Sequence, residues 1–237
     1  MAYLGGKATG SDHILKILND PKYDGMPYIE PFIGYAHILR RVVNKKSYTA
    51  YDNNKLLIVL LKYIQKSGNF PNISREQYNT YRTKYKNGTL TSADLVKASF
   101  ASFTYSYNGK MFGGYTPKTG DRNYPEERKR YYRLLRTNKQ FMSCTVEHMS
   151  FFKLNPSKKS LIYCDPPYAG TTEYAIPFNS TAFWNKVRSL SKQGHIVIVS
   201  EYKAPSDFKT ISKKHKLSSV GGKGAIKSTT EKVFAMR

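Results

Sequence analysis

The sequence predicts an α/β fold with a doubly wound sheet, into which a mainly helical segment is inserted. Two apolar runs, at residues 26–30 and 47–52, each end in an acid, and residues 35–44 between them have helical apolar spacing. This order is typical of a βαβ unit. From about residue 68 to residue 138 interleaved tyrosines and basic residues replace the apolar runs, and strand-like runs then return. One α/β core with one insertion explains the pattern.

The remaining elements follow from the same periodicities. A strongly apolar helix is expected at 56–64 and another helix at 180–191. After the insertion, strands are expected at 141–146, 160–164, 195–200, 216–220 and 232–236. We therefore assign residues 1–67 and 139–237 to the core and residues 68–138 to the inserted lobe.

The charge indicates a polyanionic partner. Lysine and arginine total 39 against 16 aspartates and glutamates, which gives a formal net charge of +23. A surplus of this size repels itself unless a polyanion neutralises it, and phosphate backbones are the commonest biological polyanion. We expect a nucleic-acid partner. A basic proteome, or association with ribosomes, would produce the same charge.

Cysteine and hydropathy patterns limit the other classes. Cys144 and Cys164 lie in apolar runs and are expected to be buried thiols. The five histidines are scattered, so we expect no structural metal. Neither an apolar leader nor a window of eighteen apolar residues is present, which predicts neither secretion nor membrane insertion. We expect a cytoplasmic protein, in the host cytoplasm if its source is a phage or a virus.

The clearest chemical signal lies where an apolar run meets Asp165, Pro166, Pro167 and Tyr168. Ligands bind at strand ends in open α/β sheets. The prolines stiffen the turn and remove two N–H donors, so its carbonyls can accept hydrogen bonds. Asp165 and one such carbonyl can both accept from a single amino group, while Tyr168 offers a flat face for a base. The alternative is an ordinary turn with a surface acid.

With this motif, most of the chain resembles the Dam-like N6-adenine DNA methyltransferases, in their alpha group. The resemblance implies a Rossmann-like, S-adenosylmethionine-dependent core with a target-recognition lobe. It also implies that Asp165 and the Pro166 carbonyl bind the adenine amine, and that Tyr168 stacks on the base after it flips out of the duplex. Methyl transfer to nitrogen is then direct and needs no metal.

Three further segments match the cofactor motifs of that family. Glu30, Pro31, Phe32 and Gly34 resemble its acid-Pro-Phe-x-Gly turn, in which glycine allows close approach of the backbone. The resemblance implies a cofactor site that comprises Tyr3, Gly5, Gly6, Lys7, Glu30, Pro31, Phe32, Gly34, Asp52, Asn53 and Asp165.

Several positions in these motifs have a second interpretation or depart from the family. Asp52 is expected to bind the cofactor ribose, although a carboxylate there would also suit the N-cap of the next helix. Lys7 is expected to meet the methionine carboxylate. Tyr35 stands where many relatives have a small residue. Thr145 is nearest to a family acid that follows the third strand, and Glu147 is the alternative.

In the lobe, the segment around Asn108 and Gly109 resembles the part that relatives present to DNA. Basic residues follow it with aromatic residues nearby, as phosphate contact and base flipping require. A solvated basic helix face would have the same composition. The expected DNA-binding residues are Asn108, Lys110, Lys118, Arg122, Arg128, Lys129 and Arg130.

We therefore predict a site-specific methyltransferase that modifies N6 of a flipped adenine in double-stranded DNA. The alternatives are methylation of cytosine N4, methylation of adenine in RNA, and an inactive DNA-binding relative. We expect a monomer in solution, with a dimer as the alternative. A solitary or viral enzyme fits the compact chain slightly better than a partner in restriction-modification.

Overall fold

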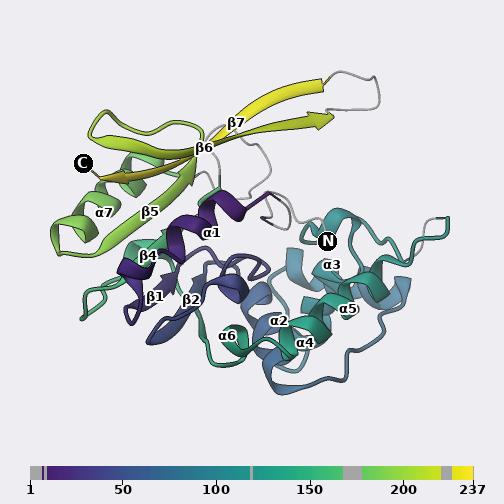
Figure 1. The fold of residues 1–237 in the computed structure, drawn as a ribbon. Coiled ribbons are helices and arrows are strands. Elements are labelled where there is room, and N and C mark those ends of the chain that lie inside the picture. The colour runs from purple at the N-terminus through teal and green to yellow at the C-terminus, as the bar shows by residue number, and fades with distance from the viewer. Residues whose placement is uncertain (1–6, 8–9, 118–119, 168–177, 220–225, 237) are drawn as a thin grey trace.

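The computed structural model describes residues 7, 10–117, 120–167, 178–219 and 226–236. Its centre is a seven-stranded sheet with the order β3-β2-β1-β4-β5-β7-β6 (Figure 1). Strands β1 to β5 are parallel, β7 is antiparallel to β5, and β6 is antiparallel to β7. The strands are β1 (Pro27–Glu30), β2 (Ser47–Asp52), β3 (Thr145–His148), β4 (Leu161–Cys164), β5 (Ile196–Glu201), β6 (Phe208–Ser219) and β7 (Ile226–Met236).

Helices cover both faces of this sheet, which confirms the doubly wound α/β prediction. On one face, α7 (Ser180–Lys192) buries Phe183 and Trp184 against side chains of β4 and β5. On the other face, α1 (Asp12–Leu18) packs against β6, and α2 (Lys55–Lys66) packs against β2 and β3. Both helices share one buried cluster with side chains of β1 and β4. Because the central strands are buried on both sides, they read as continuous apolar runs rather than as alternating ones.

The inserted segment is helical and shares its core with the sheet. Phe100 lies edge-to-face against Tyr63 of α2, and both Phe70 and Tyr132 pack on it. These residues belong to the same buried cluster as Tyr28 of β1. Residues 68–138 contain α3 (Arg75–Lys86), α4 (Leu95–Phe103) and α5 (Tyr124–Arg136), and α6 (Lys139–Met142) follows them. Short 3₁₀ turns lie along the chain at Pro21–Tyr23, Leu39–Arg41, Tyr107–Gly109 and Phe151–Lys153. The division of the chain into core and lobe stays a prediction.

The prediction of a helix at 35–44 is wrong. This stretch forms turns and a single 3₁₀ helix at Leu39–Arg41. Gly34 and Ala36 have φ values of 49° and 57°, which stop an α-helix from starting. Tertiary hydrogen bonds hold these angles: the Ile33 N–H donates to the Tyr51 carbonyl, and the Tyr131 hydroxyl donates to the Tyr35 carbonyl. No α-helix therefore starts directly behind Gly34.

The strand expected at 141–146 is also displaced. Asn138 caps a short helix by accepting from the Phe141 N–H, so β3 begins only at Thr145. Thr145 is thus the first residue of β3, and Glu147 lies nearer to the strand end where a family acid was sought. The last two strands, expected at 216–220 and 232–236, are longer than predicted.

Other expectations concern the cysteines, metal binding and membrane insertion. Cys144 and Cys164 are free and buried, as predicted. Within the described ranges, no three His, Cys, Asp or Glu side chains gather in a group that could hold a metal ion. None of the helices in those ranges combines the length and the apolar character needed to span a membrane.

We expect Phe100→Ala to lower the free energy of unfolding by about 3–5 kcal/mol, because it opens a cavity in the shared core. Urea denaturation should show one transition for sheet and lobe, since one cluster joins them. The control is Phe152→Ala, whose side chain is 44% exposed, with an expected change of about 0.5 kcal/mol or less. A separate early transition of the lobe would contradict the shared core.

Candidate active site

Acidic side chains gather at one edge of the sheet. Glu30 ends β1, Asp52 ends β2, Glu201 ends β5, and Asp165 follows β4. Because these strands are parallel neighbours, their carboxyl ends lie along the same edge. Glu231 joins them from β7, since the next residue, Lys232, pairs with Glu201.

A buried lysine connects two of these acids. Lys7 Nζ lies 2.6 Å from Asp165 Oδ1 and 2.8 Å from Glu231 Oε1. The side chains of Lys7 and Glu231 are only 3% and 1% exposed, whereas that of Asp165 is 16% exposed. Burial alone would lower the pKa of Lys7, but the two carboxylates overcome this effect and raise it. Lys7 therefore stays charged and favours the ionised form of Asp165.

Glu30 is held differently, by its own strand. The Tyr28 hydroxyl donates to Glu30 Oε2 at 2.7 Å, and both side chains are buried. Burial raises the pKa of Glu30 well above its usual value, and the negative charge of Asp165 adds to the rise against the hydrogen bond from Tyr28. The edge thus holds one acid whose pKa is raised beside one that is paired with a lysine.

Asp52 joins the loops that follow β1 and β2. Its Oδ1 accepts from the Asn54 N–H at 2.9 Å, and its Oδ2 accepts from the Gly34 N–H at 3.3 Å. Burial raises the pKa of Asp52 to about 6, while these backbone hydrogen bonds oppose the rise. The helix-capping alternative for Asp52 is wrong, because the Asn54 side chain accepts from the Leu57 N–H and caps α2 itself. The neighbouring carbonyl of Asn53 contacts His148 Nε2 at 3.1 Å.

The loop after β1 places its two aromatic residues on different sides. Phe32 packs with Phe151 and Phe183 on the α7 side, next to Glu30 and the buried Pro31. Tyr35 points into the shared core, where it lies edge-to-face against Phe103 and is 1% exposed. The larger residue at position 35 is therefore accommodated in the core and does not fill the carboxyl edge.

The comparisons with known proteins agree with this geometry. A sequence model of the D12 class N6 adenine-specific DNA methyltransferases matches residues 3–220. The chain belongs to this family. DNA adenine methylases of Salmonella typhi and Salmonella typhimurium are 27% identical to it over 225 residues, covering 85% of this chain and 74% of the relative. The reaction of the protein described here is methylation of adenine in DNA. The family implies S-adenosylmethionine as the methyl donor.

Solved structures with a similar arrangement are far more distant in sequence. The rRNA methyltransferase aviRa from Streptomyces viridochromogenes is 13% identical with a TM-score of 0.44, covering 100% of this chain and 88% of that chain. An rRNA methylase from Streptococcus thermophilus is 5% identical with a TM-score of 0.40, covering 98% of this chain and 100% of that chain. The strand order of the methyltransferase described here rests on its own hydrogen-bonded registers.

In this methyltransferase the predicted DNA-binding residues fall into two groups. Asn108 lies at φ 50° in an exposed loop that a bridge between Ser106 and Tyr115 closes. Arg130 is exposed on α5, Lys110 is half-buried, and the exposed Arg122 forms an ion pair with Glu127 at 2.8 Å. Lys118 lies outside the described residues, as do Tyr3, Gly5, Gly6 and Tyr168.

Arg128 and Lys129 form the second group, because they are buried and bind the lobe interior. The Arg128 guanidinium donates to the Thr104 carbonyl. Lys129 Nζ donates to Asn72 Oδ1 at 2.6 Å and lies 3.2 Å from Glu126. Both side chains are 4% exposed, so we leave them out of the proposed DNA surface.

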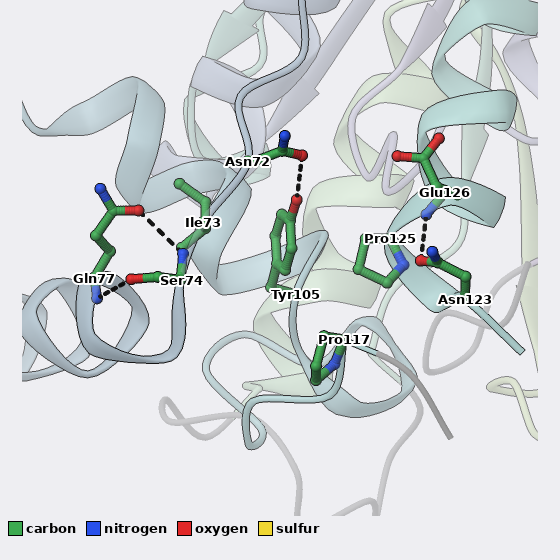
Figure 2. A pocket seen from close by; sticks show the side chains of 9 residues that line it. All are labelled: Asn72, Ile73, Ser74, Gln77, Tyr105, Pro117, Asn123, Pro125 and Glu126. Atoms are coloured by element: carbon green, nitrogen blue, oxygen red, sulfur yellow. Dashed lines mark hydrogen bonds between the residues drawn. The ribbon is translucent and has the colours of Figure 1, made fainter. Parts of the chain in front are cut away.

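A hollow of about 490 Å³ opens near Lys129 (Figure 2). The starts of α3 and α5 form it, with Tyr105 at its centre and the Tyr105 hydroxyl bonded to Asn72 Oδ1 at 3.0 Å. Its lining residues are Asn72, Ile73, Ser74, Gln77, Tyr105, Pro117, Asn123, Pro125 and Glu126. None of the carboxyl-edge acids lines it, so this hollow in the lobe is distinct from the candidate active site.

Sequence reasoning missed the residues that support the acids. Tyr28, whose hydroxyl donates to Glu30, precedes that acid by two positions. Residues two apart in a strand share a face, so this spacing was the available signal. The pairing of Lys7 with Asp165 had no such signal, since 158 residues separate them.

We expect Lys7→Met to lower the free energy of unfolding by about 3 kcal/mol at pH 8, because two carboxylates lose their buried cation. Without the lysine their pKa values rise in the folded state, which then takes up protons as the pH falls. The loss should therefore be smaller at pH 5, as measured by urea denaturation. Lys22→Met, which removes an exposed pair with Asp20, should change the free energy of unfolding far less at either pH. An equal loss at both pH values would contradict the electrostatic explanation.

Proposed function

We propose that Asp165 and the Pro166 carbonyl accept the amino hydrogens of an adenine flipped out of duplex DNA. The observation that carries this proposal is the position of Asp165: it follows β4 at the carboxyl edge, remains partly exposed, and lies 2.6 Å from the ammonium of Lys7. Pro166 is buried and Pro167 half-buried, so the turn is stiff. Tyr168 would stack on the base.

The chemical role of these acceptors follows from the electronic structure of the amine. The lone pair of an exocyclic amine is delocalised into the adenine ring. Two acceptors aligned on its hydrogens favour tetrahedral nitrogen and localise the lone pair for attack. Since the reaction is an in-line displacement, the contribution of the protein is to position the base and stabilise its charge. Lys7 assists because an ionised carboxylate accepts hydrogen bonds more strongly than a protonated one.

The carboxyl edge fits S-adenosylmethionine. Each Asp52 oxygen accepts one backbone N–H and, with two lone pairs, can accept a ribose hydroxyl as well. Gly34 brings its N–H close to this position without a side chain. Asp165 and Glu231 share a single positive charge, that of Lys7, so the carboxylates outnumber the cations at this edge. This charge balance favours a cationic sulfonium. When bound, the cofactor supplies the methyl group. The proposed site comprises Tyr3, Gly5, Gly6, Lys7, Glu30, Pro31, Phe32, Gly34, Asp52, Asn53 and Asp165.

Duplex DNA is the proposed form of the substrate. Asn108, Lys110, Arg122 and Arg130 lie on the described surface of the lobe, and we propose that they contact its backbone. The contribution of Lys118 is proposed from the sequence. A monomeric state and a cytoplasmic location stay predictions.

We expect the protein to produce N6-methyladenine when it is incubated with S-adenosylmethionine and unmethylated duplex DNA. Mass spectrometry of the digested nucleosides identifies the product. Asp165→Asn should lower the rate at least about a hundredfold, because the strong acceptor is lost, while calorimetric binding of S-adenosylhomocysteine stays within a few-fold. Asp121→Asn, an exposed change in the lobe, is the control. N4-methylcytosine, or equal rates in wild type and Asp165→Asn, would overturn this assignment.

Asp52→Asn should weaken S-adenosylhomocysteine binding by about ten- to a hundredfold, since two charge-assisted hydrogen bonds become neutral ones. The pKa of Asp52 is raised to about 6 in the free protein. Ribose hydroxyls that donate to the carboxylate would lower it, so wild-type affinity should fall as the pH drops below about 6. The variant should lack that component of the pH profile. If the affinity of Asp52→Asn for S-adenosylhomocysteine kept the pH dependence of the wild type, Asp52 would not be the ribose ligand. The role of Asp165 would not be affected by that result.

A further inference from the structure

Strands β6 and β7 form a ribbon that extends beyond the sheet. Only Lys232–Ala235 of β7 pair with β5, whereas Ile226–Glu231 pair with β6 alone. Six residues of paired strand span about 20 Å. Because β7 is antiparallel to β5 and leaves it next to Glu201, this two-stranded part passes the carboxyl edge where Asp165 lies (Figure 1).

The ribbon is strongly basic. Its strands contain six lysines and a single acid, Glu231, which is buried and bound to Lys7. Lys214 reaches the start of α1, where its Nζ would lie 3.1 Å from a Cβ placed on Gly10. The lysines are Lys209, Lys213, Lys214, Lys216, Lys227 and Lys232.

One pair of these lysines is arranged unfavourably in the free protein. Lys213 and Lys232 are direct cross-strand partners, so their side chains share one face of the ribbon. Neither forms an ion pair within the part of the chain that the structure describes. The next residue in the same row is Glu201, whose carboxylate accepts from the Tyr202 N–H at 2.6 Å. Like charges directly opposite each other destabilise a strand pair, and an anion bound between them would reverse that effect.

We propose that this ribbon is a second phosphate-binding surface, in which Lys213 and Lys232 contact the DNA backbone across the active edge from the lobe. In Figure 1 the ribbon and helices α3 to α5 lie on opposite sides of α1. A duplex whose target base reaches Asp165 would therefore have the lobe on one side and the ribbon on the other. This inference rests on the proposed binding of duplex DNA. The alternative is a solvated ribbon that makes no contact with DNA.

The test compares two double variants that remove the same charge. Lys213→Gln/Lys232→Gln changes the ribbon, whereas Lys158→Gln/Lys159→Gln changes two exposed lysines just before β4, at the opposite edge of the sheet. Fluorescence anisotropy gives Kd for a labelled, unmethylated duplex between 50 and 200 mM salt in the presence of S-adenosylhomocysteine. The slope of log Kd against log salt should decrease by about 1–2 in the ribbon variant, because each lost phosphate contact removes about 0.9. The control slope should not change.

A charge reversal excludes misfolding as the cause. Lys213→Glu places an acid opposite Lys232, so we expect the melting temperature to stay equal or rise. The same change should weaken DNA binding at 100 mM salt by roughly tenfold, since it places a negative charge beside the phosphates. A variant with a damaged fold would instead show a lower melting temperature together with a lower affinity for DNA.

The outcomes separate this inference from the proposed function. Normal formation of N6-methyladenine with equal salt slopes in both double variants would overturn the ribbon surface and leave the methyltransferase assignment intact. A reduced slope in the ribbon variant alone supports the surface whatever base is methylated, because the binding measurement involves no turnover. Equal effects of both double variants would show general electrostatic attraction and would also overturn it.

Discussion

The contact of Lys7 with Asp165 and Glu231 is the interaction on which the arrangement of this methyltransferase depends. Parallel strands bring several carboxylates to one edge, where their mutual repulsion and loss of solvation oppose folding. A single buried ammonium at 2.6 Å and 2.8 Å from two of them offsets that cost. It also joins residues far apart in the chain, since its partners lie after β4 and within β7.

The parts of this site that could be predicted follow from local patterns. An apolar run that ends in an acid locates a strand end, and the structure places Glu30, Asp52 and Asp165 at strand ends. The strand at 47–52 and the helix beginning at Ser180 were predicted at their observed starts, because their periodicity and their flanking polar residues are strong. Since the carboxyl ends of parallel strands share an edge, the sequence alone brings these acids together.

The parts that could not be predicted are those that tertiary contacts decide. The apolar spacing at 35–44 is helical, yet hydrogen bonds from Tyr131 and to Tyr51 hold a turn there. Arg128 and Lys129 look like surface residues in a basic helix, but the Thr104 carbonyl and Asn72 hold them inside. In both cases the deciding partner is distant in sequence, so no local periodicity reports it.

The same contact also links the site to the ribbon. Glu231 is the first residue of β7 beyond its pairing with β5, and Lys214 is its partner on β6. The ribbon therefore contains the residue that pairs with Lys7, and Lys7 in turn pairs with Asp165. The two-stranded part has no neighbour on its outer side among the named strands, and isolated two-stranded ribbons are marginally stable in water. The ion pair of Glu231 with the buried Lys7 attaches this two-stranded part to the carboxyl edge, although it carries Lys213 and Lys232 opposite each other.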